Sequence, residues 1–165
     1  MNLKIVDGTI LGVFNPQVEE IIIPQRIVHS IGSNAFHNCK SLRTVIFQGP
    51  SGVKNIEDGA FSGCESLCMI RLPHSIEIIS DNAFRGCVKL TTIEFPINLI
   101  YLGSSVFNAC LALETIELPK TLKLIEKTAL INCPHIKRLR ISRTTRVLGG
   151  NELTRPAGCR VSYYS

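Results

Sequence analysis

Residues 81–96 read DNAFRGCVKLTTIEFP, so that a cysteine lies three residues after a phenylalanine and three before a leucine. The leucine opens a run in which apolar residues alternate with others, and Pro96 ends that run. Taken alone, Cys87 between Arg85 and Lys89 is compatible with a reactive thiol, a metal ligand, half of a disulfide or a core side chain. The rest of the chain separates these four alternatives.

The same pattern recurs along the chain at a nearly constant period, which is the signature of a repeat protein. The segments NAFHNCKSL, GAFSGCESL, NAFRGCVKL, SVFNACLAL and TALINCPHI align without gaps. Successive phenylalanine positions are 25, 23, 23 and 23 residues apart, and the cysteines keep the same spacing. The two extra residues of the first interval fall in FQGPSGVKN, where Gly49, Pro50 and Gly52 indicate a looser turn.

Each repeat begins with a Leu-x-x-Ile-x-Leu segment whose alternation predicts a strand with one buried face. Proline follows three of these strands and ends them, because it cannot donate to a ladder. Residues 18–23, followed by Pro24, form an earlier copy. Between strands, apolar residues recur at roughly helical intervals, which predicts a short helical or 3₁₀ return. The residues expected to cap these returns at their N-termini are Ser33, Asp58, Asp81 and Ser104.

One such unit cannot bury its apolar face, but stacked units can, with coils about 4.8 Å apart. The recurring cysteine is then a small buried side chain in each coil. Five cysteines in one column cannot all pair, no CxxC occurs, and the four histidines do not cluster, so we expect no metal site. The predicted core ladder consists of Phe36, Phe61, Phe84, Phe107, Cys39, Cys64, Cys87, Cys110 and Cys133.

Cys68 lies at a position expected to face outward and is a candidate exposed thiol.

The ends of the array differ from its middle. The phenylalanine column decays to Leu130 and then Leu153, as a capping coil does. We therefore predict one domain with a lead-in at 1–17, repeats of about 23 residues at 18–147 and a degenerate capping repeat at 148–165.

The repeated motif Ile-Gly-x-x-Ala-Phe-x-x-Cys-x-x-Leu-x-x-Ile-x-Leu-Pro resembles the BspA-like (Treponema pallidum type) leucine-rich repeat, over about residues 5–153. The resemblance implies an α/β solenoid, a right-handed superhelix with a parallel sheet on its concave face and short helical or 3₁₀ returns on its convex face. It also implies a non-catalytic, cofactor-free role in protein binding, since such proteins are often surface or secreted adhesins of bacteria and protists. The N-terminal sequence, interrupted by Asp7, shows no signal peptide, so an intracellular scaffold is the alternative.

The outward residues of the strands are the predicted binding face. Parallel strands stack like positions, so Arg71 should neighbour Glu94, and Glu117 should neighbour both Glu94 and Arg140. This stripe is either a set of solvated ion pairs or a recognition surface, because a sheet built only for stability would not place two glutamates side by side. The predicted face comprises Thr44, Ile46, Met69, Arg71, Thr92, Glu94, Thr115, Glu117, Arg138 and Arg140.

The charge is asymmetric, since residues 1–135 carry 11 basic and 12 acidic residues whereas residues 136–165 carry seven basic residues and one acidic residue. This basic end suggests a second class of function, binding of an anionic glycan or, with less support, nucleic acid. Its alternative role is to solubilise the last coil and protect the sheet edge. The predicted patch is Lys137, Arg138, Arg140, Arg143 and Arg146.

No catalytic motif is recognisable: GxSxG, a Gly-rich phosphate loop and HExxH are all missing from the sequence. Glu94 and Glu117 are expected about 5 Å apart, as the carboxylates of a retaining glycosidase are, but an open sheet offers no water-excluding pocket. No run approaches the ~20 apolar residues of a membrane span. We therefore expect a monomeric binding protein rather than an enzyme.

Overall fold

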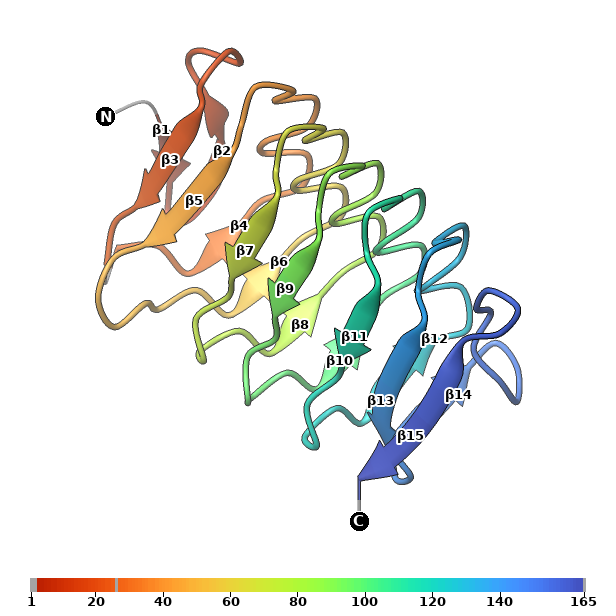
Figure 1. The fold of residues 1–165 in the computed structure, drawn as a ribbon. Helices are drawn as coiled ribbons and strands as arrows, with labels where there is room; N and C mark the ends of the chain where they lie inside the picture. The colour runs from red at the N-terminus through yellow and green to blue at the C-terminus, as the bar shows by residue number, and fades with distance from the viewer. Residues whose placement is uncertain (1–2, 26, 165) are drawn as a thin grey trace.

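The computed structural model describes residues 3–25 and 27–164 of the chain as a coil of about seven turns. In each turn one strand lies in a front row and another in a rear row (Figure 1). The described front strands are β3 (Glu20–Ile23), β5 (Thr44–Phe47), β7 (Met69–Arg71), β9 (Thr92–Glu94), β11 (Thr115–Glu117), β13 (Arg138–Ser142) and β15 (Arg160–Tyr164). The predicted parallel-stranded solenoid is thus confirmed.

The rear row is one sheet of eight described strands, parallel except for an antiparallel hairpin at its N-terminal edge. It contains the column of Ile31, Ile56 and Ile79, each paired in register with the next coil. Its strands, in order, are β1 (Leu3–Val6), β2 (Thr9–Val13), β4 (Ser30–Ile31), β6 (Asn55–Ile56), β8 (Ile78–Ile79), β10 (Tyr101–Leu102), β12 (Leu124–Glu126) and β14 (Arg146–Leu148). This sheet was not predicted: β1 and β2 fall in the predicted lead-in, and the column of Ile31, Ile56 and Ile79 was assigned to the helical returns.

The prediction of helical or 3₁₀ returns was wrong, because the described residues contain no helix of either kind. Two positions in most returns have a left-handed backbone, as in Asn34 (φ 57°) and Asn38 (φ 58°), or Gly59 (φ 62°) and Gly63 (φ 75°). A right-handed helix needs consecutive negative φ values, so each of these positions stops it. Asparagine and glycine tolerate that conformation best, which explains their recurrence there.

The returns bond to the neighbouring coil instead of forming helical turns. The N–H of Phe36 donates to the carbonyl of Ala60 (2.7 Å), and that of Phe61 donates to the carbonyl of Ala83 (2.8 Å). The expected helix caps act between coils too, since Asp81 accepts a hydrogen bond from the backbone N–H of Ser104 at 2.7 Å. Every coil is therefore joined to the next on the return side as well as through the strands.

The core is a set of side-chain ladders that run along the coil axis. The rings of Phe36, Phe61, Phe84 and Phe107 are fully buried, with successive centroids 5.0, 5.3 and 5.8 Å apart. The thiol of Cys87 donates to the carbonyl of Phe61 in the preceding coil (3.3 Å). The thiols of Cys64, Cys110 and Cys133 each donate in the same way to the carbonyl of the phenylalanine in their own preceding coil. All seven cysteines are free thiols.

Burial controls the ionisation of these thiols. It raises the pKa of Cys64, Cys87 and Cys110 far above the usual range of a thiol, and it raises that of Cys133 to about 11. A charged thiolate is costly in an apolar interior. The ladder cysteines therefore stay protonated, as small core side chains that also satisfy backbone carbonyls.

Candidate functional site

The outward side chains of the front strands form one continuous surface, here called the strand face. Alternation along each strand places one residue in the core and its neighbours outside, as in β7, where Ile70 is buried between Met69 and Arg71. Paired strands align these positions in two rows. The first row is Glu20, Thr44, Met69, Thr92, Thr115, Arg138 and Arg160, and the second is Ile22, Ile46, Arg71, Glu94, Glu117, Arg140 and Ser162.

The front ladder is interrupted twice. Among the described strands, β3 pairs with β5, β7 with β9, and β11 with β13 and β15, in three separate sheets. Glu94 and Glu117 were expected to be neighbours on paired strands. They are not register partners, because β9 and β11 belong to different sheets. Like charges directly opposite weaken a ladder, and this like-charged pair falls at an interruption.

The expected ion pair of the stripe is formed on paired strands. Arg71 holds Glu94 through two hydrogen bonds, from Nε to Oε2 (2.6 Å) and from an Nη atom to Oε1 (3.1 Å). The hydrogen bonds from Arg71 hold the pKa of the Glu94 carboxyl below its usual value. Both side chains are exposed, and exposed pairs contribute only about 0–1 kcal/mol to stability.

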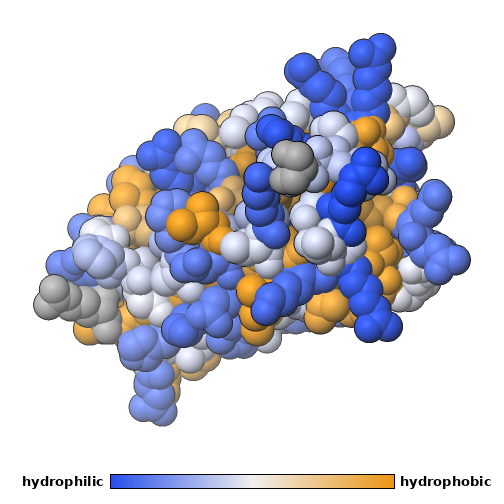
Figure 2. Space-filling model, turned by 90° about the horizontal axis from the view of Figure 1, so that it is seen from below, coloured by the Kyte–Doolittle hydropathy of each residue, from blue (hydrophilic) through white to orange (hydrophobic). Residues whose placement is uncertain are grey.

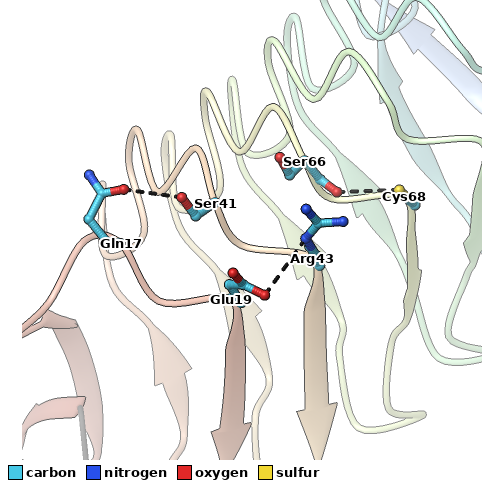
Figure 3. A network of polar contacts seen from close by, with 6 residues as sticks. All are labelled: Gln17, Glu19, Ser41, Arg43, Ser66 and Cys68. Atoms are coloured by element: carbon cyan, nitrogen blue, oxygen red, sulfur yellow. Dashed lines mark hydrogen bonds and ion pairs between the residues drawn. The ribbon is translucent and has the colours of Figure 1, made fainter.

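Three polar contacts lie along the edge of the strand face where the front strands begin, two of them between coils and one within a coil (Figure 3). Arg43 reaches Glu19 at 3.9 Å, and Ser41 donates a hydrogen bond to Gln17 at 3.1 Å. In the following coil, the thiol of Cys68 donates a hydrogen bond to the carbonyl of Ser66 at 3.3 Å. Cys68 thus lies at the exposed start of β7, as its sequence position indicated.

Cys68 is expected to be the first thiol to react with iodoacetamide in the folded protein. It is exposed, whereas the ladder thiols are buried and protonated, and only a thiolate attacks the reagent. Mass spectrometry after brief labelling at pH 8 should show modification first at position 68, then at half-buried Cys159, and the ladder positions should label only in denaturant. Rapid native labelling of Cys87 would contradict the buried ladder.

Two hollows lie on the strand face. The first, of about 450 Å³, opens at the interruption between β5 and β7. The segment of the chain that contains the two extra residues lies between these two strands in the sequence. Its apolar lining includes Ile46, Phe47, Leu72 and Phe95, and the Arg71–Glu94 pair lies at its rim. The second, of about 430 Å³, lies across β11, β13 and β15 and is lined by Thr115, Ile116, Glu117, Arg138, Leu139, Arg140, Arg160 and Ser162.

Apolar side chains are exposed next to the first hollow. Ile22 and Ile46 are register partners on β3 and β5, with 45% and 41% of their surface exposed, and Met69 on β7 is 57% exposed. On the side seen in Figure 2, apolar residues reach the surface as separate areas among hydrophilic ones. The strand face therefore has an apolar part on its first coils.

The predicted basic patch is divided by the fold. Arg138 and Arg140 lie on the strand face, and Lys137 at its border pairs with Glu114 at 3.1 Å. Arg143 packs over the ring of Tyr163 (4.6 Å from its centroid), and Arg146 opens β14 in the rear sheet. The five residues do not form a single surface.

Sequence reasoning missed one arginine of the strand face. A 23-residue step from Arg138 reaches Val161, but the last coil is one residue shorter, and pairing sets Arg160 opposite Arg138. The alternation of polar and apolar residues at the start of RVSYY was the sequence signal that could have placed Arg160 on the outward side. The rings of Tyr163 and Tyr164 were likewise not recognised as partners of Arg143 and Arg140, which lie 4.6 and 4.2 Å from the two centroids.

Two kinds of site have no candidate in the part of the chain that the structure describes. None of its His, Cys, Asp and Glu residues come together in threes that could hold a metal ion. The same part of the chain includes no helix that is long and apolar enough to cross a membrane.

A parallel solenoid with an exposed strand face defines a repeat protein of the solenoid class. The model of the BspA type leucine-rich-repeat region matches residues 14–137 in six copies, and the chain belongs to that family. Leucine-rich-repeat proteins are generally protein-interaction modules, and their fold typically serves as a non-catalytic scaffold. No curated protein matches this chain.

Solved structures show the same fold. A Treponema pallidum leucine-rich-repeat protein is 32% identical, with a TM-score of 0.75, over 80% of this chain and 62% of its own. A leucine-rich-repeat protein from Bacteroides ovatus is 32% identical (TM-score 0.73, 89% and 38%). A leucine-rich cell surface protein from Faecalibacterium prausnitzii is 25% identical (TM-score 0.75, 94% and 50%). This chain thus spans less than two thirds of each of these proteins.

Proposed function

We propose that this chain is a non-catalytic module that binds a protein partner through the strand face. The hollow between β5 and β7 carries this proposal, because exposed Ile46 lines it and exposed Ile22 and Met69 lie on the strands to either side of β5. Apolar side chains that gather on a surface commonly mark interaction sites, and binding energy concentrates where a side chain fills a pocket. The hollow would receive an apolar side chain of the partner, and the Arg71–Glu94 pair would border it.

The double variant Ile46→Glu/Met69→Glu is expected to weaken partner binding at least tenfold, because it places charge beside the apolar hollow. Partners captured from surface fractions of source and host cells by the native chain would be identified and then titrated by biolayer interferometry. The matched control is Ile97→Glu/Leu111→Glu, whose targets are 58% and 46% exposed and lie outside the front strands.

The control should keep its affinity within about twofold. Equal loss in both double variants would argue against the strand face, because it would show a general effect of added charge. Thermal unfolding of each variant would establish that the compared proteins are folded.

We further propose that the module acts at a cell surface, as an adhesin-type binder. The support is the Faecalibacterium prausnitzii relative, a leucine-rich cell surface protein that aligns with 94% of this chain. Antibody labelling of intact source cells tests this: labelling without permeabilisation supports it, and labelling only after permeabilisation favours an intracellular scaffold.

A further inference from the structure

We propose that the strand-face arginines Arg138, Arg140 and Arg160 bind an acidic, extended segment of the protein partner, with carboxylates at alternate residues. This inference rests on the proposed function and adds the chemistry of the partner at the C-terminal coils. It concerns the hollow across β11, β13 and β15, not the apolar hollow between β5 and β7.

Two of these arginines face one another without a neutralising partner. Arg138 and Arg160 are register partners on the parallel strands β13 and β15, so their backbones lie about 4.8 Å apart. Like charges directly opposite destabilise a sheet. None of the five ion pairs within residues 3–25 and 27–164 includes Arg138, Arg140 or Arg160. The excess positive charge is thus left for a ligand.

The hollow between the arginines has the chemistry of a carboxylate site. Thr115 and Ser162, which carry hydroxyl groups, line it together with the three arginines. Glu117 is the one acidic residue in this lining, so three positive charges face one negative charge. Arginine presents a planar fork that matches a carboxylate with two parallel hydrogen bonds.

Aromatic packing restricts one of these guanidinium groups, that of Arg140. The Arg140 guanidinium lies 4.2 Å from the centroid of Tyr164, and the Lys120 amine lies 5.4 Å from the same ring. A guanidinium stacked on a ring keeps its edge N–H groups available for an anion. Restricting the side chain before binding reduces the entropy lost on binding. Arg140 is therefore prepared to receive a carboxylate.

The spacing of the arginines indicates which acidic pattern fits. Arg138 and Arg140 are two residues apart on one strand, or about 6.6 Å. An extended peptide projects side chains to the same side at that interval, at positions i and i+2. A segment that lies along β13 with an acidic residue at every second position can therefore place one carboxylate on each arginine.

The test titrates the full chain with a fluorescein-labelled peptide of sequence (Glu-Thr)₄ and follows anisotropy at 150 mM salt. Two peptides serve as controls: (Gln-Thr)₄, which removes the charge, and Thr₄Glu₄, which keeps the charge but not the alternation. The test variant is Arg138→Gln/Arg160→Gln. The matched variant Arg143→Gln/Arg146→Gln removes the same charge from residues off the strand face.

We expect (Glu-Thr)₄ to bind at least fivefold more tightly than Thr₄Glu₄ and (Gln-Thr)₄ not to bind. Arg138→Gln/Arg160→Gln should weaken (Glu-Thr)₄ at least tenfold, and the matched variant less than twofold. The test variant should melt at the same temperature as the native chain or higher, because it removes a repulsive pair. That result separates a binding role from a structural one.

Three outcomes would overturn the inference. Equal weakening by both variants would show unspecific attraction to a basic end, and no binding of (Glu-Thr)₄ at 1 mM would show that no such site exists. A heparin octasaccharide that binds more tightly and loses affinity in Arg138→Gln/Arg160→Gln would assign the hollow to sulfated glycans. If the inference fails in any of these ways while Ile46→Glu/Met69→Glu still weakens partner binding at least tenfold, the proposed function stands without it.

Discussion

Phe84→Ala is expected to lower the free energy of unfolding by about 3–5 kcal/mol, the usual cost of truncating a buried phenylalanine. Phe84 is fully buried in the middle of the stack, with ring centroids 5.3 Å from Phe61 and 5.8 Å from Phe107. Its removal leaves a cavity between two rings that backbone bonds on both sides hold in place. Urea unfolding followed by circular dichroism measures the loss.

Phe14→Ala is the matched control for this prediction. Phe14 is 68% exposed and contacts Lys4, whose amine lies 5.2 Å from the ring centroid, so its truncation should cost less than about 1 kcal/mol. Similar losses in the two variants would show that the phenylalanine ladder does not carry the core. Because repeat arrays are stabilised by neighbouring coils, the Phe84 variant should also unfold less cooperatively.

Alkaline pH is expected to destabilise the protein through its cysteine ladder. Burial raises the pKa of Cys64, Cys87 and Cys110, while the same thiols in the unfolded chain ionise near pH 8.5. Above that pH the unfolded state binds fewer protons than the native state, so stability falls as pH rises. Each such thiol contributes up to about 1.4 kcal/mol per pH unit, so three of them make a steep loss.

Urea unfolding at pH 8.0, 9.0 and 9.5, with a non-thiol reductant present, measures this slope below the usual tyrosine pKa. Cys87→Ala provides the control, since it lowers stability at every pH but should reduce the slope by about one proton. Equal stability at pH 8.0 and 9.5 would contradict the proposed burial of neutral thiols.

Several features of the fold were predictable because they depend on local pattern. The repeat period located the front strands, and the alternation around Ile70, Ile93 and Ile116 identified which side chains would be buried. The recurrence of cysteine in register with phenylalanine indicated a core column before any contact was known. The pairing of Arg71 with Glu94 followed from the same period, since equal positions in neighbouring coils must stack.

Other features were not predictable from pattern alone. Helical spacing in the returns was misleading, because left-handed residues such as Asn34 and Asn38 turn the backbone toward the next coil. From β4 onward the second sheet is made of two- and three-residue strands, which have too few residues for any periodicity to show. The place of Arg160 opposite Arg138 depended on a last coil one residue shorter than the others.

The sequence by itself determined the repeat, the buried columns and the outward rows, because these follow from the period of the chain and from which side chains avoid water. The tertiary structure alone decided where the front ladder is interrupted, which arginines lie together and where the two hollows open. Those properties depend on how neighbouring coils stack against one another, which no single repeat specifies. A difference of one or two residues in a coil changes the register and separation of strands without changing the pattern within any single repeat.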